Sequence, residues 1–393
     1  MKSEWTYRPL GELVSFASGG TPSKKRDDYW DGTIPWISAK TLKTENIDTS
    51  DLFITEEGLK AGSKIAPKGS ILLLTRGSGL FNGIPIARVE KDVAFNQDIK
   101  CLDSYGEVEN EFIFYWLLSQ KDYLMAKVGV TGIGAGKFDL DFLQKLMIPI
   151  PSERERKSIV GFASSISEKI RCNAKVNDNL FAQMQALYAA WFIDCIPFGG
   201  IKPSSWQKTS IYTIADIIYG APFSSKQFNT DGKGIPIIRI RDLKEQKVAT
   251  YTTEKHPKGY LLQAGDIVVG MDGEFVPYIW GSDEAWLNQR VCVFKNKRLK
   301  GKAFLYFTIK PLLYAIEQTQ VATTVIHIGK KDFDAFEITL PDPRVLDSFD
   351  AITTPMVEKI VENRFEIKQL ELLRDAFLPK LMSGELDVSN IQL

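Results

Sequence analysis

The chain changes character at residues 146–155, LMIPIPSERE. An apolar segment bounded by prolines is followed by Ser152 and, three residues later, by Glu155, the spacing of a capping box at the start of a helix. A similar junction recurs at residues 338–343, ITLPDP, where Asp342 precedes a proline at the first helical position. A segment with helical periodicity follows each junction, and a helix of about forty residues would be ~60 Å long. We therefore expect two modules, each followed by a long helix.

The sequence on the two sides of the first junction is related. GTP at residues 20–22 and IPWI at 34–37 are echoed by GAP at 220–222 and IPII at 235–238, and Asn96-Gln97 is echoed by Asn288-Gln289. The offset falls from 201 between Pro35 and Pro236, through 192 between the asparagines, to 190 between Pro151 and Pro341. Small loop deletions in the second copy would produce this drift. An internal repeat of this length predicts two related globular modules and a two-part ligand or partner.

The repeat predicts an α+β chain in four parts. These are a β-rich module at 1–150, a helix at 151–196, a second β-rich module at 197–341, and a second helix with the C-terminal tail at 342–393. Short β-like runs separated by turn residues dominate the modules, with one helix expected within residues 111–127 of the first. Pro379 should kink or end the second long helix, and Gly384 should stop it.

Both long helices carry apolar residues at alternating three- and four-residue spacing, which is typical of a coiled-coil seam. Asn173 and Asn363 interrupt the two stripes near the middle of each helix, at the offset of 190 that relates the junctions. We expect an antiparallel pair about a pseudo-two-fold axis, with Asn173 facing Asn363. Such a pair would fix the register, because slippage leaves each amide against apolar side chains. The alternative is that both asparagines point to solvent.

Composition limits the possible functions. The 393 residues include 49 Lys and Arg and 49 Asp and Glu, so the formal net charge is zero and any attraction to nucleic acid must come from local patches or a basic partner. Four cysteines without a C-x-x-C pair and two histidines argue against a zinc site or a disulfide framework and favour the reduced cytosol. The N-terminus lacks an apolar signal core, and the apolar runs are too short to span a bilayer.

No catalytic constellation is recognisable. Residues 131–138, TGIGAGKF, are similar to a phosphate-binding loop, but Thr131 occupies the first glycine position and Phe138 the Ser/Thr position that would hold magnesium. The segment is either a flexible glycine loop or a loop that approaches a phosphate backbone, with Lys137 supplying charge. The sequence lacks the G-x-S-x-G motif of a nucleophile elbow. It has only two histidines that could act as the base of a Ser-His-Asp triad. The sequence therefore predicts no catalytic residues and no metal site.

Two β-rich modules, each followed by a long helix, resemble the DNA specificity subunit of type I restriction-modification systems. The resemblance rests on SGGTPS at 18–23, IPWIS at 34–38, the junction at 146–155, and AFLPKLMSGEL at 376–386. It covers essentially the whole chain, and its specificity lies in the order and duplication of the motifs. The second copy departs from the pattern at residues 220–223, GAPF, which lack the Gly-Thr-Pro-Ser form.

The resemblance implies a noncatalytic, cytoplasmic subunit in which each module is a target recognition domain for one half of a bipartite, asymmetric site in double-stranded DNA. The paired helices would set the gap between the half-sites. They would also dock two modification (methyltransferase) subunits that methylate adenine, and restriction subunits would complete the complex. S-adenosylmethionine, ATP and Mg would then be bound by partner subunits and not by this chain. The alternatives are a coiled-coil adaptor without DNA contact and a self-contained DNA-modifying enzyme.

The repeat also selects candidates for DNA contact. Residues that differ at matched positions suit base recognition, because the two half-sites would differ, and arginine can pair with guanine while aspartate can accept from cytosine. The base candidates are Ser38, Lys40, Arg76, Arg239, Arg241 and Asp272. The phosphate candidates are Thr21, Ser23, Lys24, Lys25, Arg26, Lys137, Lys226, Arg290 and Lys330. For the base candidates the alternative is ordinary surface charge or an ion pair within the module.

Two further groups of residues are expected to serve the fold. Asn96-Gln97 and Asn288-Gln289 occur in both copies, which favours a shared turn-capping role over adenine recognition. Tyr29, Trp30 and Trp36 are expected to pack and not to stack on bases, because duplex DNA keeps its bases stacked.

Overall fold

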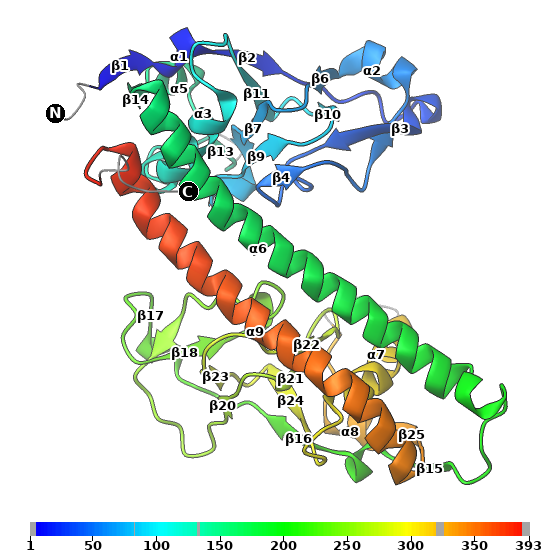
Figure 1. Cartoon of the computed structure of the whole chain (residues 1–393). Coiled ribbons are helices and arrows are strands. Elements are labelled where there is room, and N and C mark those ends of the chain that lie inside the picture. The colour runs from blue at the N-terminus through cyan, green and yellow to red at the C-terminus, as the bar shows by residue number, and fades with distance from the viewer. Residues whose placement is uncertain (1–4, 82, 132–133, 320–325, 387–393) are drawn as a thin grey trace. The chain divides into compact units, whose positions relative to one another are not determined.

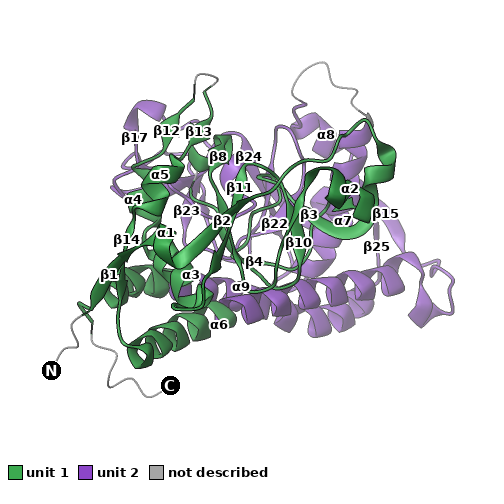
Figure 2. Cartoon of the chain, turned by 90° about the horizontal axis from the view of Figure 1, so that it is seen from above, with its two compact units in different colours: residues 1–168, 371–393 green, residues 169–370 purple. Residues whose placement is uncertain are grey.

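The computed structural model describes residues 5–81, 83–131, 134–319 and 326–386. The chain divides into two compact units, which we call unit 1 (residues 1–168 and 371–393) and unit 2 (residues 169–370) (Figure 2). Both long helices contribute to both units. Helix α6, Glu153–Tyr188, begins in unit 1 and ends in unit 2, whereas α9, Pro343–Met382, begins in unit 2 and ends in unit 1 (Figure 1).

Unit 1 is built around a five-stranded sheet in the order β2-β11-β7-β9-β4. Its central strand β7, Ile71–Leu74, is buried at every residue, as four consecutive apolar side chains predict. The other strands of this sheet are β2 (Val14–Ser18), β4 (Asn46–Ile47), β9 (Ile86–Val89) and β11 (Ile99–Ser104). A four-stranded sheet has the order β5-β3-β10-β6 and consists of β3 (Trp30–Ile37), β5 (Phe53–Ile54), β6 (Lys64–Ala66) and β10 (Val93–Phe95).

Two smaller sheets complete unit 1. One pairs β1 (Thr6–Pro9) with β14 (Met147–Ile150), and the other has the order β12-β13-β8, formed by Gly129–Val130, Gly136–Lys137 and Arg76–Gly77. Its short helices are α1 (Leu10–Leu13), α2 (Glu56–Gly62), α3 (Asn110–Ser119), α4 (Lys121–Met125) and α5 (Leu140–Gln144).

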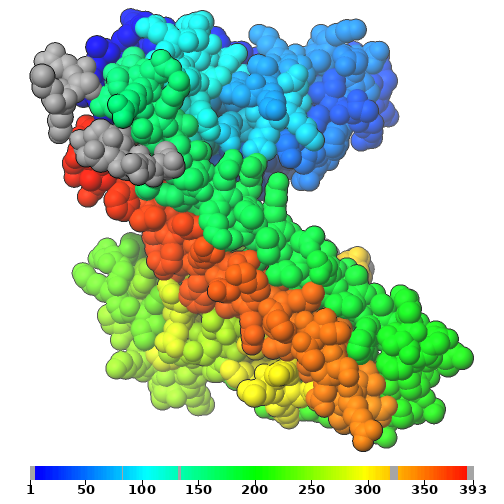
Figure 3. Space-filling view, in the orientation of Figure 1, coloured from blue at the N-terminus to red at the C-terminus, as the bar shows by residue number. Residues whose placement is uncertain are grey.

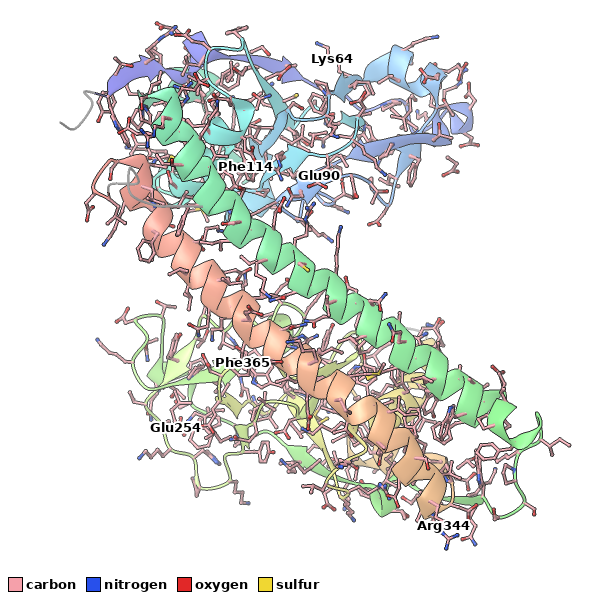
Figure 4. The ribbon with its side chains drawn as sticks, in the orientation of Figure 1. Lys64, Glu90, Phe114, Glu254, Arg344 and Phe365 are labelled. Atoms are coloured by element: carbon pink, nitrogen blue, oxygen red, sulfur yellow. The ribbon has the colours of Figure 1, made fainter. Side chains whose placement is uncertain are left out.

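Helix α3 is the central helix of unit 1. Seven consecutive residues from Phe112 to Leu118 are buried, so the helix is covered on all sides. It shares one core with Ile159 and Ala163 of α6, and Phe114 is labelled beside α6 in Figure 4. The single helix predicted within residues 111–127 is instead two helices. The backbone leaves the helical region at Gln120, with φ −95° and ψ 3°, and α4 starts at the next residue.

Unit 2 repeats this plan. The sheet order β16-β24-β21-β22 matches β2-β11-β7-β9, and β19-β18-β23-β20 matches β5-β3-β10-β6. The parallel pairing of β3 with β10 recurs between β18 and β23. The strands are β15 (Gln207–Ser210), β16 (Ala215–Tyr219), β17 (Phe228–Asn229), β18 (Ile235–Ile238), β19 (Tyr251–Thr252), β20 (Leu261–Leu262), β21 (Ile267–Gly270), β22 (Pro277–Ile279), β23 (Ala285–Leu287), β24 (Val291–Asn296) and β25 (Glu337–Leu340). The duplication predicted from the sequence is thereby confirmed.

The remaining elements of unit 2 also have counterparts in unit 1. Strands β15 and β25 pair as β1 and β14 do. Helix α7 (Lys302–Thr319) follows β24 as α3 follows β11, and α8 (Lys330–Asp334) precedes β25 as α5 precedes β14. Tyr188 of α6 and Phe192 of the π-helical segment Ala189–Ile193 pack on Phe304 of α7 and Phe349 of α9, which anchors these helices on the unit.

The ends of the long helices follow from their sequence. The Glu155 amide donates to Ser152 Oγ at 3.4 Å and the Ser152 amide donates to Glu155 Oε2 at 3.0 Å, which confirms the predicted capping box. Helix α9 starts at Pro343 as predicted. It does not end at Pro379, because the Pro379 carbonyl still accepts from the Ser383 amide at 3.0 Å. Gly384, with φ +71°, follows its last turn.

The two long helices contact each other in both units and run antiparallel in unit 2. In unit 1, Phe162 of α6 contacts Phe377 of α9, with 6.3 Å between ring centroids. In unit 2, the Asn173 amide donates to Glu366 at 2.8 Å, and Asn363 donates to Asn177 Oδ1 at 2.8 Å. In unit 2 the residue numbers along α9 fall as those along α6 rise, so the predicted antiparallel direction is confirmed there.

The predicted pairing of Asn173 with Asn363 is wrong. The register in unit 2 places Asn177, one helical turn beyond Asn173, opposite Asn363, and it places Asn173 beside Glu366. The two asparagines are also not directed to solvent, since Asn173 is 4% exposed and Asn363 is 1% exposed. The apolar stripe located the buried polar layer, but the offset between the repeats does not determine the register to within one turn.

Helix α9 packs on unit 2, where Figure 3 shows its orange segment against the yellow-coloured part of the chain. Arg364 donates to the Ile279 carbonyl, and Lys368 forms an ion pair with Asp283. A Cβ atom at Gly281 would lie 2.4 Å from Cδ of Arg364, so the glycine leaves room for this side chain. In the part of the chain that the structure describes, no helix is both long and apolar enough to cross a membrane.

Candidate nucleic-acid interface

The candidate site consists of polar and charged side chains on the two units. Within the described ranges, no three His, Cys, Asp or Glu side chains gather as metal ligands. The asparagines shared by the two modules form hydrogen bonds with backbone amides. Asn96 Oδ1 accepts from the Asp98 amide at 3.1 Å, and Asn288 Oδ1 accepts from the Gln289 amide at 2.8 Å. Their predicted role in turn capping is confirmed.

The phosphate-contact candidates in the turn at residues 21–26 differ in whether they already have a partner within the unit. Arg26 forms two hydrogen bonds to Asp28, at 2.8 and 2.6 Å, and these lower the pKa of the Asp28 carboxyl. Thr21 Oγ1 donates to Gln97 at 2.7 Å, and Ser23 Oγ accepts from the Lys25 amide at 3.4 Å. The ammonium groups of Lys24 and Lys25 are exposed and have no ion-pair partner among the described residues. These two lysines are therefore the ones available to an anionic ligand.

The aromatic residues near this turn pack within unit 1. Trp30 and Trp36 meet edge to face with centroids 5.3 Å apart, and their indole nitrogens donate to the carbonyls of Ser23 and Gly20. The Arg26 guanidinium lies 4.7 Å from the centroid of the Tyr29 ring. The prediction that the aromatics are packing residues is confirmed for Trp30 and Trp36.

The candidate base-contact residues that follow the matched strands β3 and β18 differ in their exposure and in their contacts within the unit. Ser38 lies in a turn where its amide donates to Thr41 Oγ1 at 2.8 Å, and Lys40 is exposed. The Arg239 guanidinium donates to Thr250 and lies 3.9 Å from Asp242, and burial lowers its pKa. The structure thus favours the alternative for Arg239, a contact within the unit. Arg241 remains largely exposed, with Nε 3.7 Å from Asp242.

A cationic pair lies on the short sheet of unit 1. Arg76 of β8 is directly opposite Lys137 of β13 in an antiparallel ladder, and both side chains are exposed. The amides of Thr75 and Arg76 both donate to the Asp98 carbonyl, at 2.8 and 3.2 Å. The Asp98 carboxylate accepts from Asn96 Nδ2 at 3.3 Å. The structure therefore brings together Arg76 and Lys137, two residues that the sequence selected separately. Gly132 and Ile133 of the glycine loop lie outside the described residues.

Unit 2 carries the opposite arrangement of charge at the same place. Asp272 pairs with His327 in an antiparallel bridge, and the Asp272 carboxylate lies 2.7 Å from His327 Nδ1. Arg290 Nη1 lies 3.6 Å from that carboxylate and 3.3 Å from the same imidazole nitrogen. Here the structure joins Asp272 and Arg290 and adds a histidine.

Backbone hydrogen bonds show that these two clusters are equivalent. The Phe138 amide donates to the Thr75 carbonyl at 2.9 Å, and the Ile328 amide donates to the Met271 carbonyl at 3.0 Å. The Met271 amide donates to the Arg290 carbonyl at 2.9 Å, as that of Thr75 does to Asp98. The matched pairs are thus Arg76 with Asp272, Asp98 with Arg290, and Lys137 with His327.

Asp98 and His327 were not among the residues predicted from the sequence. The signal that identifies them is the repeat offset, which is 192 at Asn96 and Asn288 and also relates Asp98 to Arg290. The offset of 190 relates Lys137 to His327. Of the remaining phosphate candidates, Lys226 is exposed in the turn Ser225–Gln227, and Lys330 is the exposed first residue of α8, three residues after His327.

The duplicated fold and the paired helices define a class of protein with two related modules. The chain belongs to the family of the type I restriction modification DNA specificity domain, whose model matches residues 2–181 and 203–360. The match includes one copy in each half of the chain, in agreement with the repeat.

Several specificity subunits are similar to this chain. The specificity subunit of the type I restriction enzyme MjaIX from Methanocaldococcus jannaschii is 26% identical over 419 residues, which cover 99% of this chain and 95% of that protein. The EcoR124I/EcoR124II specificity subunit from Escherichia coli is 31% identical over 161 residues, 40% of each chain. The crystal structure of a type I restriction-modification S subunit from M. genitalium covers 96% of both chains with a TM-score of 0.53 and 17% identity, a likeness of fold.

Proposed function

We propose that this chain is the noncatalytic DNA-recognition subunit of a type I restriction-modification enzyme and that each unit recognises one half of a bipartite, asymmetric site. The observation that carries the proposal is the same fold in both units with different charged side chains at matched positions. A shared scaffold gives both units the same way to dock on a duplex, and the divergent side chains give each its own sequence preference.

The long helices would fix the gap between the half-sites. A continuous helix rises 1.5 Å per residue, so the 36 residues of α6 correspond to roughly 54 Å. The second helix pairs with α6 in both units, which resists bending of either helix alone. The buried asparagine layer in unit 2 would hold this pair in one register.

Methyltransferase and restriction subunits would supply the chemistry. Two modification subunits would dock on this chain, bind S-adenosylmethionine and methylate adenine, and restriction subunits would bind ATP and Mg. The formal net charge of zero supports a division of labour, because phosphate neutralisation over a long duplex requires more positive charge than this chain carries in excess. DNA affinity should therefore be far higher in the complex than for the chain alone.

Methylation-sensitive sequencing of host DNA, with and without the gene for this chain, tests the proposal. The expected result is one adenine-methylated motif, made of two specified blocks and a fixed unspecified gap, that disappears in the deletion strain. An unchanged methylation pattern would contradict DNA recognition by this subunit. A coiled-coil adaptor would leave no bipartite site protected in a footprint, even with methyltransferase subunits present.

A further inference from the structure

We propose that the matched three-residue clusters are the positions at which the two units differ in base specificity, with Arg76 and Lys137 recognising a guanine and Asp272 recognising a cytosine. The inference rests on the proposed function and adds the residues and the base chemistry. It starts from two sets that occupy equivalent backbone positions, Arg76, Asp98 and Lys137 in unit 1 and Asp272, Arg290 and His327 in unit 2.

The signs of charge are exchanged between the clusters. Where unit 1 has an arginine at residue 76 and an aspartate at residue 98, unit 2 has Asp272 and Arg290. A cluster that served only to close the short sheet would have no reason to reverse both charges while keeping the same backbone hydrogen bonds. The exchange instead fits two ligand surfaces with opposite hydrogen-bonding patterns, which the two edges of a G·C pair provide in the major groove.

In unit 1 neither cation of the cluster pairs with the Asp98 carboxylate within the described residues. Arg76 and Lys137 are directly opposite each other, and like charges at such positions destabilise a sheet. The residues that the structure describes give neither side chain an ion-pair partner, and the nearby Asp98 carboxylate accepts from Asn96. Two adjacent cationic donors without an internal acceptor suit the O6 and N7 acceptors of guanine.

In unit 2 the cluster presents an oriented carboxylate. His327 Nδ1 at 2.7 Å and Arg290 at 3.6 Å both approach Oδ1 of Asp272, and these contacts leave Oδ2 to accept from another donor. A carboxylate that accepts a hydrogen bond suits the N4 amino group of cytosine. In this arrangement Asp272 contacts the base, and His327 and Arg290 are positioning residues.

Labelled elements next to each cluster lie away from the long helix of the same unit. In Figure 2, the β12–β13 hairpin of unit 1 lies on the side of that unit opposite α6, and α8, which follows His327, lies on the side of unit 2 opposite α9. A duplex bound there would leave the helix surfaces open to protein partners.

The test uses the complex of this chain with its methyltransferase subunits and duplexes that carry single base-pair changes in the methylated motif. In the variant D272R/R290D/H327K, unit 2 receives the charges of unit 1. The expected result is a change of preference from cytosine to guanine at one position of one half-site, by about 5- to 150-fold, with the other half-site unchanged. The variant R76Q/K137Q should relax a guanine in the other half-site.

Three outcomes would overturn the inference: unchanged preferences, equal weakening on every sequence, or both variants altering the same half-site. Lys208→Gln is a matched control, because Lys208 is an exposed lysine that pairs with Glu337 across β15 and β25. It should leave all base preferences intact. If the wild-type complex shows no sequence preference at all, the proposed function itself fails. The variant R76Q/K137Q also guards against misreading a loss of fold as a loss of preference. It removes like-charge repulsion and should not lower the melting temperature.

Discussion

Asn363 on α9 donates its side-chain amide to Asn177 Oδ1 on α6 at 2.8 Å, and both residues are buried between the two helices. Asn177 in turn approaches the Ile360 carbonyl at 3.4 Å, whereas Asn363 Oδ1 has no partner among the described residues. The layer thus combines one good hydrogen bond with one unsatisfied acceptor. This combination costs stability and gains a defined register.

The asparagine layer predicts a difference between single and double replacements. Asn363→Ala leaves Asn177 Oδ1 buried without its donor and should lower the free energy of unfolding by about 1–3 kcal/mol. Replacing both residues by leucine removes both polar groups and should be neutral or stabilising. Urea unfolding of the full chain measures both effects. Equal destabilisation by the two variants would show that the hydrogen bond does not define this layer.

A second prediction concerns Arg298 and Asp350. The Asp350 carboxylate is 1% exposed, and burial raises its pKa, while hydrogen bonds from Arg298 at 3.3 and 2.9 Å oppose that rise. Arg298→Ala should raise the pKa of Asp350 further and destabilise the protein at pH 7 by about 2–4 kcal/mol.

The sign of the pH dependence follows from that raised pKa. Protonated Asp350 is favoured in the folded state, so its contribution to stability is present below its ordinary value of 3.8 and is lost as pH rises through the higher folded pKa. The deficit of the Arg298→Ala variant should therefore shrink in acid. Melting temperatures from pH 3 to 7 measure it, and Asp350→Asn in the same background should reduce the deficit at pH 7. A deficit that is constant with pH would exclude the charge on Asp350 as its cause.

Replacing Arg239 and replacing Arg241 in unit 2 should have different effects on stability and on base preference. Arg239→Ala removes contacts with Thr250 and Asp242 and should lower the melting temperature, because the guanidinium is engaged inside the unit. Arg241→Ala should preserve stability, and if Arg241 is a bidentate base contact it should relax one position of one half-site by about 1–3 kcal/mol. Calorimetry and binding to substituted duplexes separate the two effects. A stable Arg239→Ala variant with relaxed specificity would instead restore Arg239 as a base contact.

Lys24 and Lys25 provide a prediction about phosphate contact. Replacing either by glutamine should weaken binding of the complex equally on all sequences and reduce the slope of log affinity against log salt by about one. Arg26→Gln is the comparison, since its guanidinium is already paired with Asp28 and its loss should have a smaller effect. A sequence-dependent loss at Lys24 or Lys25 would indicate base contact.

Features set by local chemistry were predictable from the sequence, and features set by tertiary contacts were not. The capping box at Ser152 and the buried run at Ile71 depend on neighbouring residues, and both were found as predicted. The partner of Asn363 depends on the packing of two helices from distant parts of the chain, and the prediction missed it by one turn. Arg239 has the residue type of a base contact, and only the fold reveals that Thr250 and Asp242 engage it. The equivalence of Lys137 and His327 was present in the offset but became visible through backbone hydrogen bonds.

The most direct test of the account is the length of the gap between the half-sites after the helices are shortened. Removing residues 166–172 from α6 and the facing residues 367–373 from α9 takes about 10 Å, close to three base pairs, from each helix and retains the apolar seam. Methylation mapping with the shortened chain should return the same two half-sites with a gap about three base pairs shorter. An unchanged gap with intact half-sites would contradict the proposal that the paired helices set the distance between two DNA-recognition modules.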